Sequence, residues 1–317
     1  MKKSTLLVLA LALLLFTQCK TEPAAPTGLV TNHAMVVSAR VEASRIGSEI
    51  MQKGGNAFDA MVATQLALAV AYPVAGNIGG GGFMVYRKSN GDVGALDYRE
   101  KAPLAASKNM YLDSLGNVIP GKSTLGAFAI GVPGSVAGIL AVHEKLGSLP
   151  LSEIIAPVIQ LAEKGVVVTE RQAQALKYFQ QEIIEANGDS TLFANTFREG
   201  DTIRYPALAK TLRNISENGR AGFYTGETAQ KLAAFIQEKG GMVTEEDLEK
   251  YEAVWRQPII FDYRGIRIIS MSPPSSGGVT MEQILKMMEP FDVSELGHNT
   301  EKYMQLFTEA AKRAYAD

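Results

Sequence analysis

Four consecutive glycines, at 79–82, are the feature that most restricts how this chain can fold. Because glycine has no Cβ atom, such a segment can take backbone conformations that other residues avoid, and another chain or a ligand can approach it closely. The glycines follow a predicted helix at 57–71 that is apolar on almost every side, which indicates a helix buried on most faces. Asn56 is expected to cap this helix, with Asp59 in its first turn, and Pro73 to end it.

A β-hairpin is predicted directly after the glycines. Its strands are expected at 83–87 and 93–99, and the Asn-Gly pair at 90–91 is the strongest short signal for a hairpin turn. Alternation along the second strand places Asp97 and Arg99 on the same face of the sheet.

Helices are predicted to dominate the remainder of the chain. Thr244 and Asp247 have the spacing of a capping box, Ser152 is expected to cap another helix, and Pro206 suits a first helical position. The expected helices are at 38–52, 135–146, 152–165, 169–186, 207–218, 227–239, 280–288 and 300–316, and further strands are expected at 259–263 and 266–271.

The composition is that of a globular protein, and it excludes several classes of function. The chain has 317 residues, with 31 Lys or Arg and 33 Asp or Glu, so its formal charge is −2. Nucleic-acid binding needs clustered positive charge, and this near balance gives no sign of it. A single cysteine excludes an internal disulfide and a cysteine-based zinc cluster. The three histidines lie far apart, without the spacing of a metal site, and no cofactor is expected.

The N-terminus has the pattern of an export signal. Two lysines precede an apolar run at 6–16, which is too short for a comfortable membrane span. Cys19, the only cysteine, follows this run, and the arrangement resembles a bacterial lipoprotein signal in which the cysteine is lipidated. Gln18 departs from the small residue usual at that position, and the alternative is that Cys19 is incidental to an ordinary signal peptide.

We therefore expect three parts: a signal segment at 1–19, a flexible tether at 20–29 and a folded body at 30–317. The tether is low in large apolar groups and contains two prolines. A chain with this leader is expected to be exported, and to be periplasmic or lipid-anchored to a bacterial membrane. A lipid on Cys19 would be its means of membrane attachment.

Two motifs suggest chemistry that their surroundings do not support. The segment 116–123 fits the phosphate-binding pattern G-x-x-x-x-G-K-S, but it lacks a buried strand before it and a helix after it, so a surface turn is expected. Ser135 follows Pro133 and Gly134 instead of the glycine elbow of a serine hydrolase, and His143 has no obvious orienting acid.

Arg99 stands near the expected end of the second hairpin strand. A guanidinium in this position can bind a carboxylate through two parallel hydrogen bonds, which lysine cannot match. The alternative is an ion pair with Asp97 or Glu100. The spacing alone favours this alternative, because charged strand ends are common.

Six motifs occur in order along the body, and together they are similar to the large-subunit region of the γ-glutamyltranspeptidase family. The resemblance spans about residues 30 to 317, and several motifs in the correct order are far more specific than any one of them. The motifs are Asn56-Ala-Phe-Asp-Ala60, Ala75-Gly-Asn-Ile-Gly-Gly-Gly-Gly-Phe-Met84, Asp97-Tyr-Arg-Glu-Lys-Ala-Pro103, Val132-Pro-Gly-Ser135, Asp262-Tyr-Arg-Gly265 and Pro273-Pro-Ser-Ser-Gly-Gly278.

This resemblance implies an α+β fold of the N-terminal-nucleophile hydrolase type, a four-layer αββα sandwich that is incomplete in this chain. It also implies a precursor that cuts itself to free a threonine at the start of a small subunit. The threonine hydroxyl attacks the γ-glutamyl amide of glutathione, its own α-amino group can act as the base, and backbone amides would stabilise the oxyanion. The acyl-enzyme then passes the γ-glutamyl group to water or to an amino-acid or peptide acceptor.

The resemblance also implies a role for Arg99. In the family, the arginine of the R-E-x-A-P motif holds the α-carboxylate of the γ-glutamyl group, and this reverses the preference drawn from spacing. The glycines at 79–82 are then expected to be a close-packed backbone element near the site.

The processing threonine of the family lies well beyond the segment that matches 300–317. We therefore expect a small subunit from the same precursor to complete the site, and this chain alone to be inactive and marginally stable. A non-catalytic lipoprotein that binds γ-glutamyl or amino-acid ligands is the alternative.

Overall fold

The computed structural model describes residues 28–317. The predicted signal segment, Cys19 and most of the predicted tether at 20–29 lie outside these residues, so all three stay predictions. The described residues divide into a short stretch at 28–35 and a body at 36–317. Within the short stretch, the Thr31 hydroxyl donates to the Ala34 carbonyl oxygen at 3.0 Å. Every helix in the described part of the chain is too short or too polar to cross a membrane.

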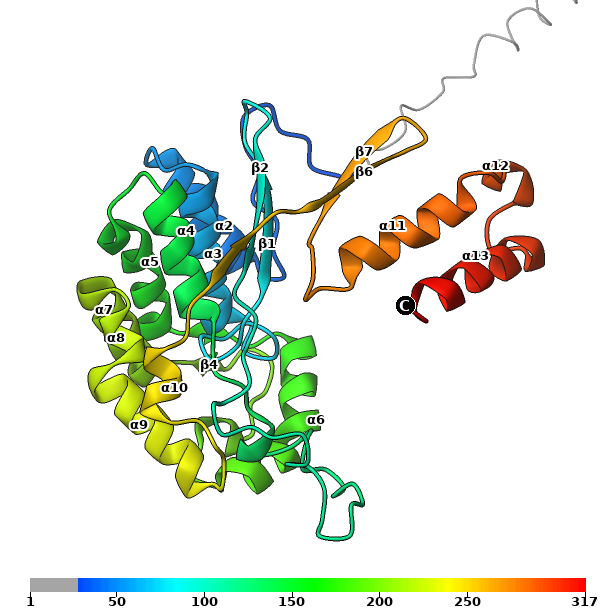
Figure 1. Cartoon of the computed structure of the whole chain (residues 1–317). Helices are drawn as coiled ribbons and strands as arrows, with labels where there is room; N and C mark the ends of the chain where they lie inside the picture. Colours follow the sequence, from blue (N-terminus) through cyan, green and yellow to red (C-terminus); the bar gives the residue numbers. More distant parts are fainter. Residues whose placement is uncertain (1–27) are drawn as a thin grey trace, which may run out of the picture. The chain divides into compact units, whose positions relative to one another are not determined.

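The body consists of helices with short strands between them (Figure 1). The helices are α2 (Val41–Gln52), α3 (Ala57–Ala71), α4 (Ser135–Leu146), α5 (Leu151–Lys164), α6 (Glu170–Asn187), α7 (Pro206–Asn218), α8 (Ala221–Tyr224), α9 (Gly226–Glu238), α10 (Glu245–Glu249), α11 (Gly277–Met288), α12 (Val293–Leu296) and α13 (Glu301–Ala314). The strands are β1 (Phe83–Arg87), β2 (Val93–Asp97), β3 (Val166–Val167), β4 (Thr202–Ile203), β5 (Val254–Arg256), β6 (Ile259–Tyr263) and β7 (Ile266–Ser270).

The predicted hairpin is confirmed and forms part of a three-stranded antiparallel sheet with the order β1-β2-β5. The two hairpin strands pair residue by residue, from Phe83 opposite Asp97 to Arg87 opposite Val93. One face of this sheet meets the helices: the Tyr86 ring of β1 packs edge-on against a ring of α3, with centroids 5.4 Å apart.

The second hairpin strand is shorter than predicted, because it ends at Asp97 and not at Arg99. Tyr98 still exchanges two backbone hydrogen bonds with Gly82. The N–H of Arg99 then donates to the Asp97 carboxylate at 3.1 Å instead of to a neighbouring strand. This side-chain hydrogen bond replaces the ladder at the point where the chain leaves the sheet.

Helix α3 occupies the core of the body, and its predicted limits are confirmed. The Asn56 side chain accepts from the backbone N–H groups of Phe58 and Asp59, and the Asp59 carboxylate accepts from the N–H of Asn56, which is the predicted cap. Ten of its fifteen residues are buried, and α2, α4 and α5 pack around it. The prediction that this apolar helix is buried on most faces is thus confirmed.

Asp59 also ties α3 to the segment after α4. Its buried carboxylate accepts from the Ser148 hydroxyl at 2.6 Å and from the Ser148 N–H at 3.0 Å. Burial alone would raise the pKa of Asp59, but hydrogen bonds from Ser148, Asn56 and Leu149 outweigh it and hold the pKa below its ordinary value. The motif at 56–60 therefore has a structural role: it caps α3 and connects this helix to the segment after α4.

Several shorter elements differ from the sequence predictions. Helix α5 begins at Leu151 with Pro150 in the N-cap position, so the prediction that Ser152 caps it is wrong. The chain enters the helix two residues earlier, and Ser152 already lies in the first turn. Strands β3, β4 and β5 and helices α8 and α12 were not predicted, because two to four residues carry too little periodicity.

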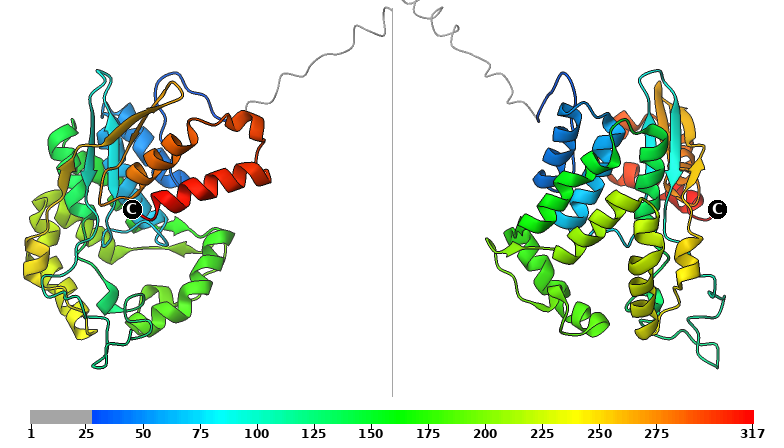
Figure 2. Two further views of the ribbon diagram at one scale, coloured as in Figure 1. Left: turned by 45° about the vertical axis from the view of Figure 1, so that its right-hand side comes forward. Right: turned by 90° about the vertical axis from the view of Figure 1, so that its left-hand side faces the viewer.

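The C-terminal part contains a separate hairpin, β6-β7, beside α11, and α13 packs along α11 (Figures 1 and 2). Few of its side chains are buried. Large apolar residues that stay exposed there are Ile260, Ile266, Phe291, Met304, Phe307 and Tyr315. This part of the body therefore presents an apolar surface that the described residues do not cover.

Candidate functional site

A cavity of about 680 Å³ lies where the chain leaves β2. Its walls come from the glycine run, from the segment after β2 and from the long loop that leads to α4. Lining residues include Asn77, Gly80, Arg99, Lys101, Tyr111 and Ile130. The structure thus brings together two features that the sequence singled out, the glycines at 79–82 and Arg99.

The backbone of Arg99 is held from both sides. Its N–H donates to Asp97 Oδ1, and its carbonyl oxygen accepts from the Tyr251 hydroxyl at 2.7 Å. Burial, together with the nearby carboxylates of Asp97 and Glu100, raises the pKa of the Tyr251 hydroxyl, so the proton that it donates is retained. The Arg99 side chain consequently starts from a fixed point in the cavity wall.

The glycine run fits closely against this backbone. A Cβ atom on Gly81 would lie 2.6 Å from the carbonyl oxygen of Tyr98, and one on Gly134 would overlap the same oxygen. The Gly80 carbonyl oxygen accepts from the N–H of Gly134 at 2.8 Å, which joins the run to the start of α4. The expectation of a close-packed element beside Arg99 is confirmed.

The Arg99 guanidinium has no ion-pair partner among residues 28–317, and the residue is exposed. It lies 6.0 Å from the centre of the Phe83 ring. Asp97 pairs instead with Arg256 of β5, with Oδ2 2.7 Å from Nη2 and 2.9 Å from Nε. The ion pair of Arg99 with Asp97 or Glu100, which the spacing alone favoured, is not formed.

This arrangement can bind an anion. A guanidinium without a counter-ion can accept a carboxylate in a two-pronged geometry, which gives both strength and orientation. Lys101 also lines the cavity, but its amine donates to the Glu252 carbonyl oxygen at 2.8 Å and lies 4.8 Å from the centre of the Tyr251 ring. Of the described cations that line the cavity, Arg99 is the one available to a ligand.

Tyr251 and Arg256 are parts of this site that sequence analysis missed. Both stand more than 150 positions after the residues that they hold. Arg256 lies on a three-residue strand, which is too short for a period-two pattern to reveal. Their roles come from tertiary contacts alone.

The other sequence motifs are not arranged for catalysis. The segment 116–123 is a surface turn, as predicted: Gly116 and Gly121 have φ angles of 84° and 75°, and the next α-helix does not begin until Ser135. Ser135 is buried at the first turn of α4, and His143, two turns later, contacts the Leu149 carbonyl oxygen through Nε2 at 2.8 Å. Neither a phosphate loop nor a serine–histidine pair is present at these positions.

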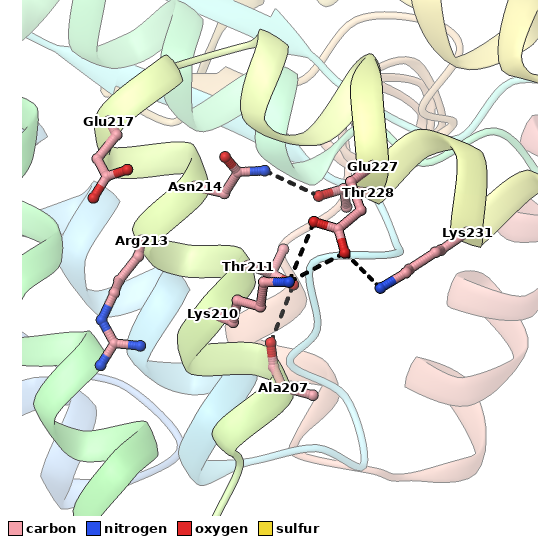
Figure 3. A pocket seen from close by; sticks show the side chains of 9 residues that line it. All are labelled: Ala207, Lys210, Thr211, Arg213, Asn214, Glu217, Glu227, Thr228 and Lys231. Atoms are coloured by element: carbon pink, nitrogen blue, oxygen red, sulfur yellow. Dashed lines mark hydrogen bonds and ion pairs between the residues drawn. The ribbon is translucent and has the colours of Figure 1, made fainter.

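A second pocket, of about 440 Å³, lies between α7 and α9 (Figure 3). Lys210 and Lys231 lie 3.1 Å and 2.6 Å from Glu227, and Arg213 pairs with Glu163 of α5. These side chains are about half exposed or more, so the pairs contribute little to stability. They do neutralise the cations of the pocket.

Comparison with known proteins identifies the family. The family model described as Gamma-glutamyltranspeptidase matches residues 43–317. A glutathione hydrolase proenzyme of Escherichia coli (strain K12) is 43% identical over 287 residues, which cover 89% of this chain and 50% of that protein. A protein of the same name from Bacillus subtilis (strain 168) is 38% identical over 292 residues, which cover 91% of this chain and 50% of that protein.

Solved structures agree in fold. The crystal structure of Helicobacter pylori γ-glutamyltranspeptidase has a TM-score of 0.88 and 45% identity, with coverage of 91% of this chain and 84% of that chain. The transpeptidase CapD of Bacillus anthracis has a TM-score of 0.74 and 28% identity, with coverage of 90% and 92%.

The fold is therefore the α+β fold of N-terminal-nucleophile hydrolases, as expected. Residues 28–317 form sheets of three, two and two strands. These sheets make up only part of the four-layer sandwich of this fold. The chain belongs to the γ-glutamyltranspeptidase family. It spans about half the length of the curated relatives it matches.

Proposed function

We propose that this chain is the large-subunit region of an enzyme that transfers the γ-glutamyl group of glutathione and related γ-glutamyl compounds. The names of the curated relatives, glutathione hydrolase proenzymes, support this activity. The observation that supports it most is the Arg99 guanidinium, which has no ion-pair partner within residues 28–317 and lines a cavity walled by the glycine run. The non-catalytic lipoprotein alternative has no support from these relatives.

Arg99 binds the α-carboxylate of the γ-glutamyl group in this proposal. The two-pronged pairing orients the donor, so that its γ-carbonyl carbon faces the nucleophile. A threonine hydroxyl from polypeptide beyond residue 317 forms the new C–O bond, and its proton passes through the threonine α-amino group to the leaving amine as the amide C–N bond breaks. Water or the amine of an amino acid or peptide then takes the γ-glutamyl group.

A small subunit from the same precursor is proposed to supply that threonine. The curated relatives carry the name proenzyme, and this chain covers half of each. It covers 84% of the chain in the Helicobacter pylori structure, which is consistent with a relative divided into two polypeptides. The apolar surface on the β6-β7 hairpin and on α13 offers an area for such a subunit to cover.

Export is proposed on the sequence of the leader alone. The basic start, the apolar run at 6–16 and Cys19 support a periplasmic or lipid-anchored protein. Metabolic labelling with a fatty acid should be lost in Cys19→Ala, and a wild-type protein that takes up no label would contradict lipidation.

The activity is tested with the complete protein and a chromogenic γ-glutamyl anilide. We expect turnover by the protein that contains the threonine-led segment, and none by the 317-residue chain alone. Turnover by the 317-residue chain would show that the nucleophile lies within it. A complete protein without turnover would contradict the proposed activity.

A further inference from the structure

Asp97 has two arginines near it but pairs with one. Its side chain is about one-tenth exposed, its Oδ2 atom is bound by Arg256, and its Oδ1 atom accepts the backbone N–H of Arg99. A carboxylate so buried is costly without a cation. Arg256 supplies that cation, and the Arg99 guanidinium has no ion-pair partner among the described residues.

We propose that Arg256 is a positioning residue that keeps the Arg99 guanidinium available by occupying the Asp97 carboxylate. This inference rests on the proposed function, because the ligand of Arg99 is the α-carboxylate assigned there. Arg256 acts through Arg99 and does not touch the substrate. The residue thus determines how tightly a γ-glutamyl donor binds, and not how fast it reacts.

The register of the sheet explains how Arg256 reaches Asp97. On β5, Arg256 lies opposite Ala95 of β2, and Val254 lies opposite Asp97. Ala95 and Asp97 share a face of β2, so Arg256 meets Asp97 along the diagonal, a distance that a long side chain spans. The small side chain of Ala95 leaves room for the arginine stem.

Arg99 is the alternative partner because its own backbone is bound to the same carboxylate. When Arg256 is replaced by a neutral residue, the long side chain of Arg99 can fold back onto Asp97, which lies two residues before Arg99. Such a pair would compete with the substrate carboxylate for the same guanidinium. Loss of Arg256 should consequently weaken donor binding without any change in the groups that react.

The test uses the complete protein, and wild-type turnover of a γ-glutamyl anilide reports separately on the proposed function. Arg256→Gln should raise the KM of the donor about fivefold with little change in kcat. The double variant Asp97→Asn/Arg256→Gln should recover most of this rise, because no carboxylate remains to hold Arg99. Recovery alone does not separate this role from that of a merely structural pair, because loss of Asp97 relieves an orphaned buried charge in either case; the position of the Arg99 guanidinium in the single variant separates them.

Arg213→Gln is the matched control, because it removes the arginine of another ion pair between neighbouring elements, the pair with Glu163 of α5, and neither of these residues lines the Arg99 cavity. It should leave KM unchanged. If Arg256→Gln does not fold, Arg256→Met, which keeps an apolar stem, replaces it. An unchanged KM in the single variant, or an equal rise in the single and double variants, overturns the inference while wild-type turnover preserves the proposed function.

A crystal structure of the single variant gives a readout that does not depend on activity. We expect the Arg99 guanidinium within about 4 Å of the Asp97 carboxylate, the range of an ion pair. A guanidinium that still points away from Asp97 overturns the inference even if the wild-type protein proves inactive.

Discussion

Two pockets in the described part of this protein, the one between α7 and α9 and the cavity after β2, differ in how their charges are paired. Between α7 and α9, Glu227 lies between two lysines and pairs with both. In the cavity after β2, the carboxylate beside Arg99 is bound by Arg256, and the Arg99 guanidinium has no counter-ion among the described residues. The presence of cations therefore does not by itself define an anion-binding site. A site also needs a cation that the protein has not already neutralised.

The backbone around the two pockets differs as well. Arg99 starts from a segment fixed by Asp97, by Tyr251 and by glycines that admit no side chain. The lysines of the second pocket extend from exposed faces of α7 and α9. A ligand that binds at Arg99 therefore meets a pre-organised group, which lowers the entropy cost of binding.

The largest expected effect is at Arg99 itself. Arg99→Lys should raise the KM for glutathione in the complete protein, because the loss of two-pronged pairing costs about 2–4 kcal/mol, or roughly 30-fold to several hundred-fold. Self-cleavage of the precursor should persist, as shown by gel analysis. Lys210→Gln, in the paired pocket, is the control and should leave KM unchanged. An unchanged KM in Arg99→Lys would remove this residue from the site.

The next effect tests the fixed backbone. Gly81→Ala should lower the free energy of unfolding by about 1–3 kcal/mol, because its Cβ atom would press on the Tyr98 carbonyl oxygen. Gly79→Ala is a matched control in the same run, since a Cβ atom there meets nothing closer than 3.8 Å. Urea unfolding measures both. Equal stability of the two variants would mean that the run is not close-packed.

A smaller effect is expected at Tyr251. Tyr251→Phe removes the hydrogen bond to the Arg99 carbonyl oxygen, which should cost about 1 kcal/mol of stability. Tyr178→Phe, on an exposed face of α6, should cost nothing measurable in the same urea titration. If the two variants unfold alike, the carbonyl oxygen of Arg99 does not depend on Tyr251.

The smallest effect should appear in the paired pocket. Glu227→Gln frees Lys210 and Lys231, and isothermal titration with inorganic phosphate should then detect weak binding that the wild-type protein lacks near neutral pH. Hydrogen bonds from Lys231 and Lys210 hold the pKa of Glu227 below its ordinary value, so its carboxylate stays charged until the pH falls below that value. Phosphate binding by the wild-type protein at neutral pH would contradict the role given to pairing.

Local signals explain which elements could be predicted. Helix α3 has its cap, its apolar run and a terminating proline all within its own sequence, and its limits were predicted to the residue. The hairpin has an Asn-Gly turn between two alternating segments. Arg99 was selected because it stands at the predicted end of such a strand, two residues beyond the observed end of β2, and the resemblance to a family supplied the role proposed for it.

What could not be predicted depends on contacts between distant parts of the chain. Tyr251 and Arg256 lie far from Arg99 in sequence, and β5 has three residues. The sequence alone favoured an ion pair of Arg99 with Asp97 or Glu100, because Arg256 could not be placed on the neighbouring strand. The tertiary pair of Arg256 with Asp97 thus changed the interpretation of the charged residues around Arg99.

The most direct test of the central claim is a crystal structure of the complete protein soaked with L-glutamate, the acyl part of the proposed donor. We expect the α-carboxylate to lie on the Arg99 guanidinium, with two N···O distances of about 2.7–2.9 Å, and Asp97 to stay paired with Arg256. Glutamate bound elsewhere, with Arg99 turned onto Asp97, would contradict this claim.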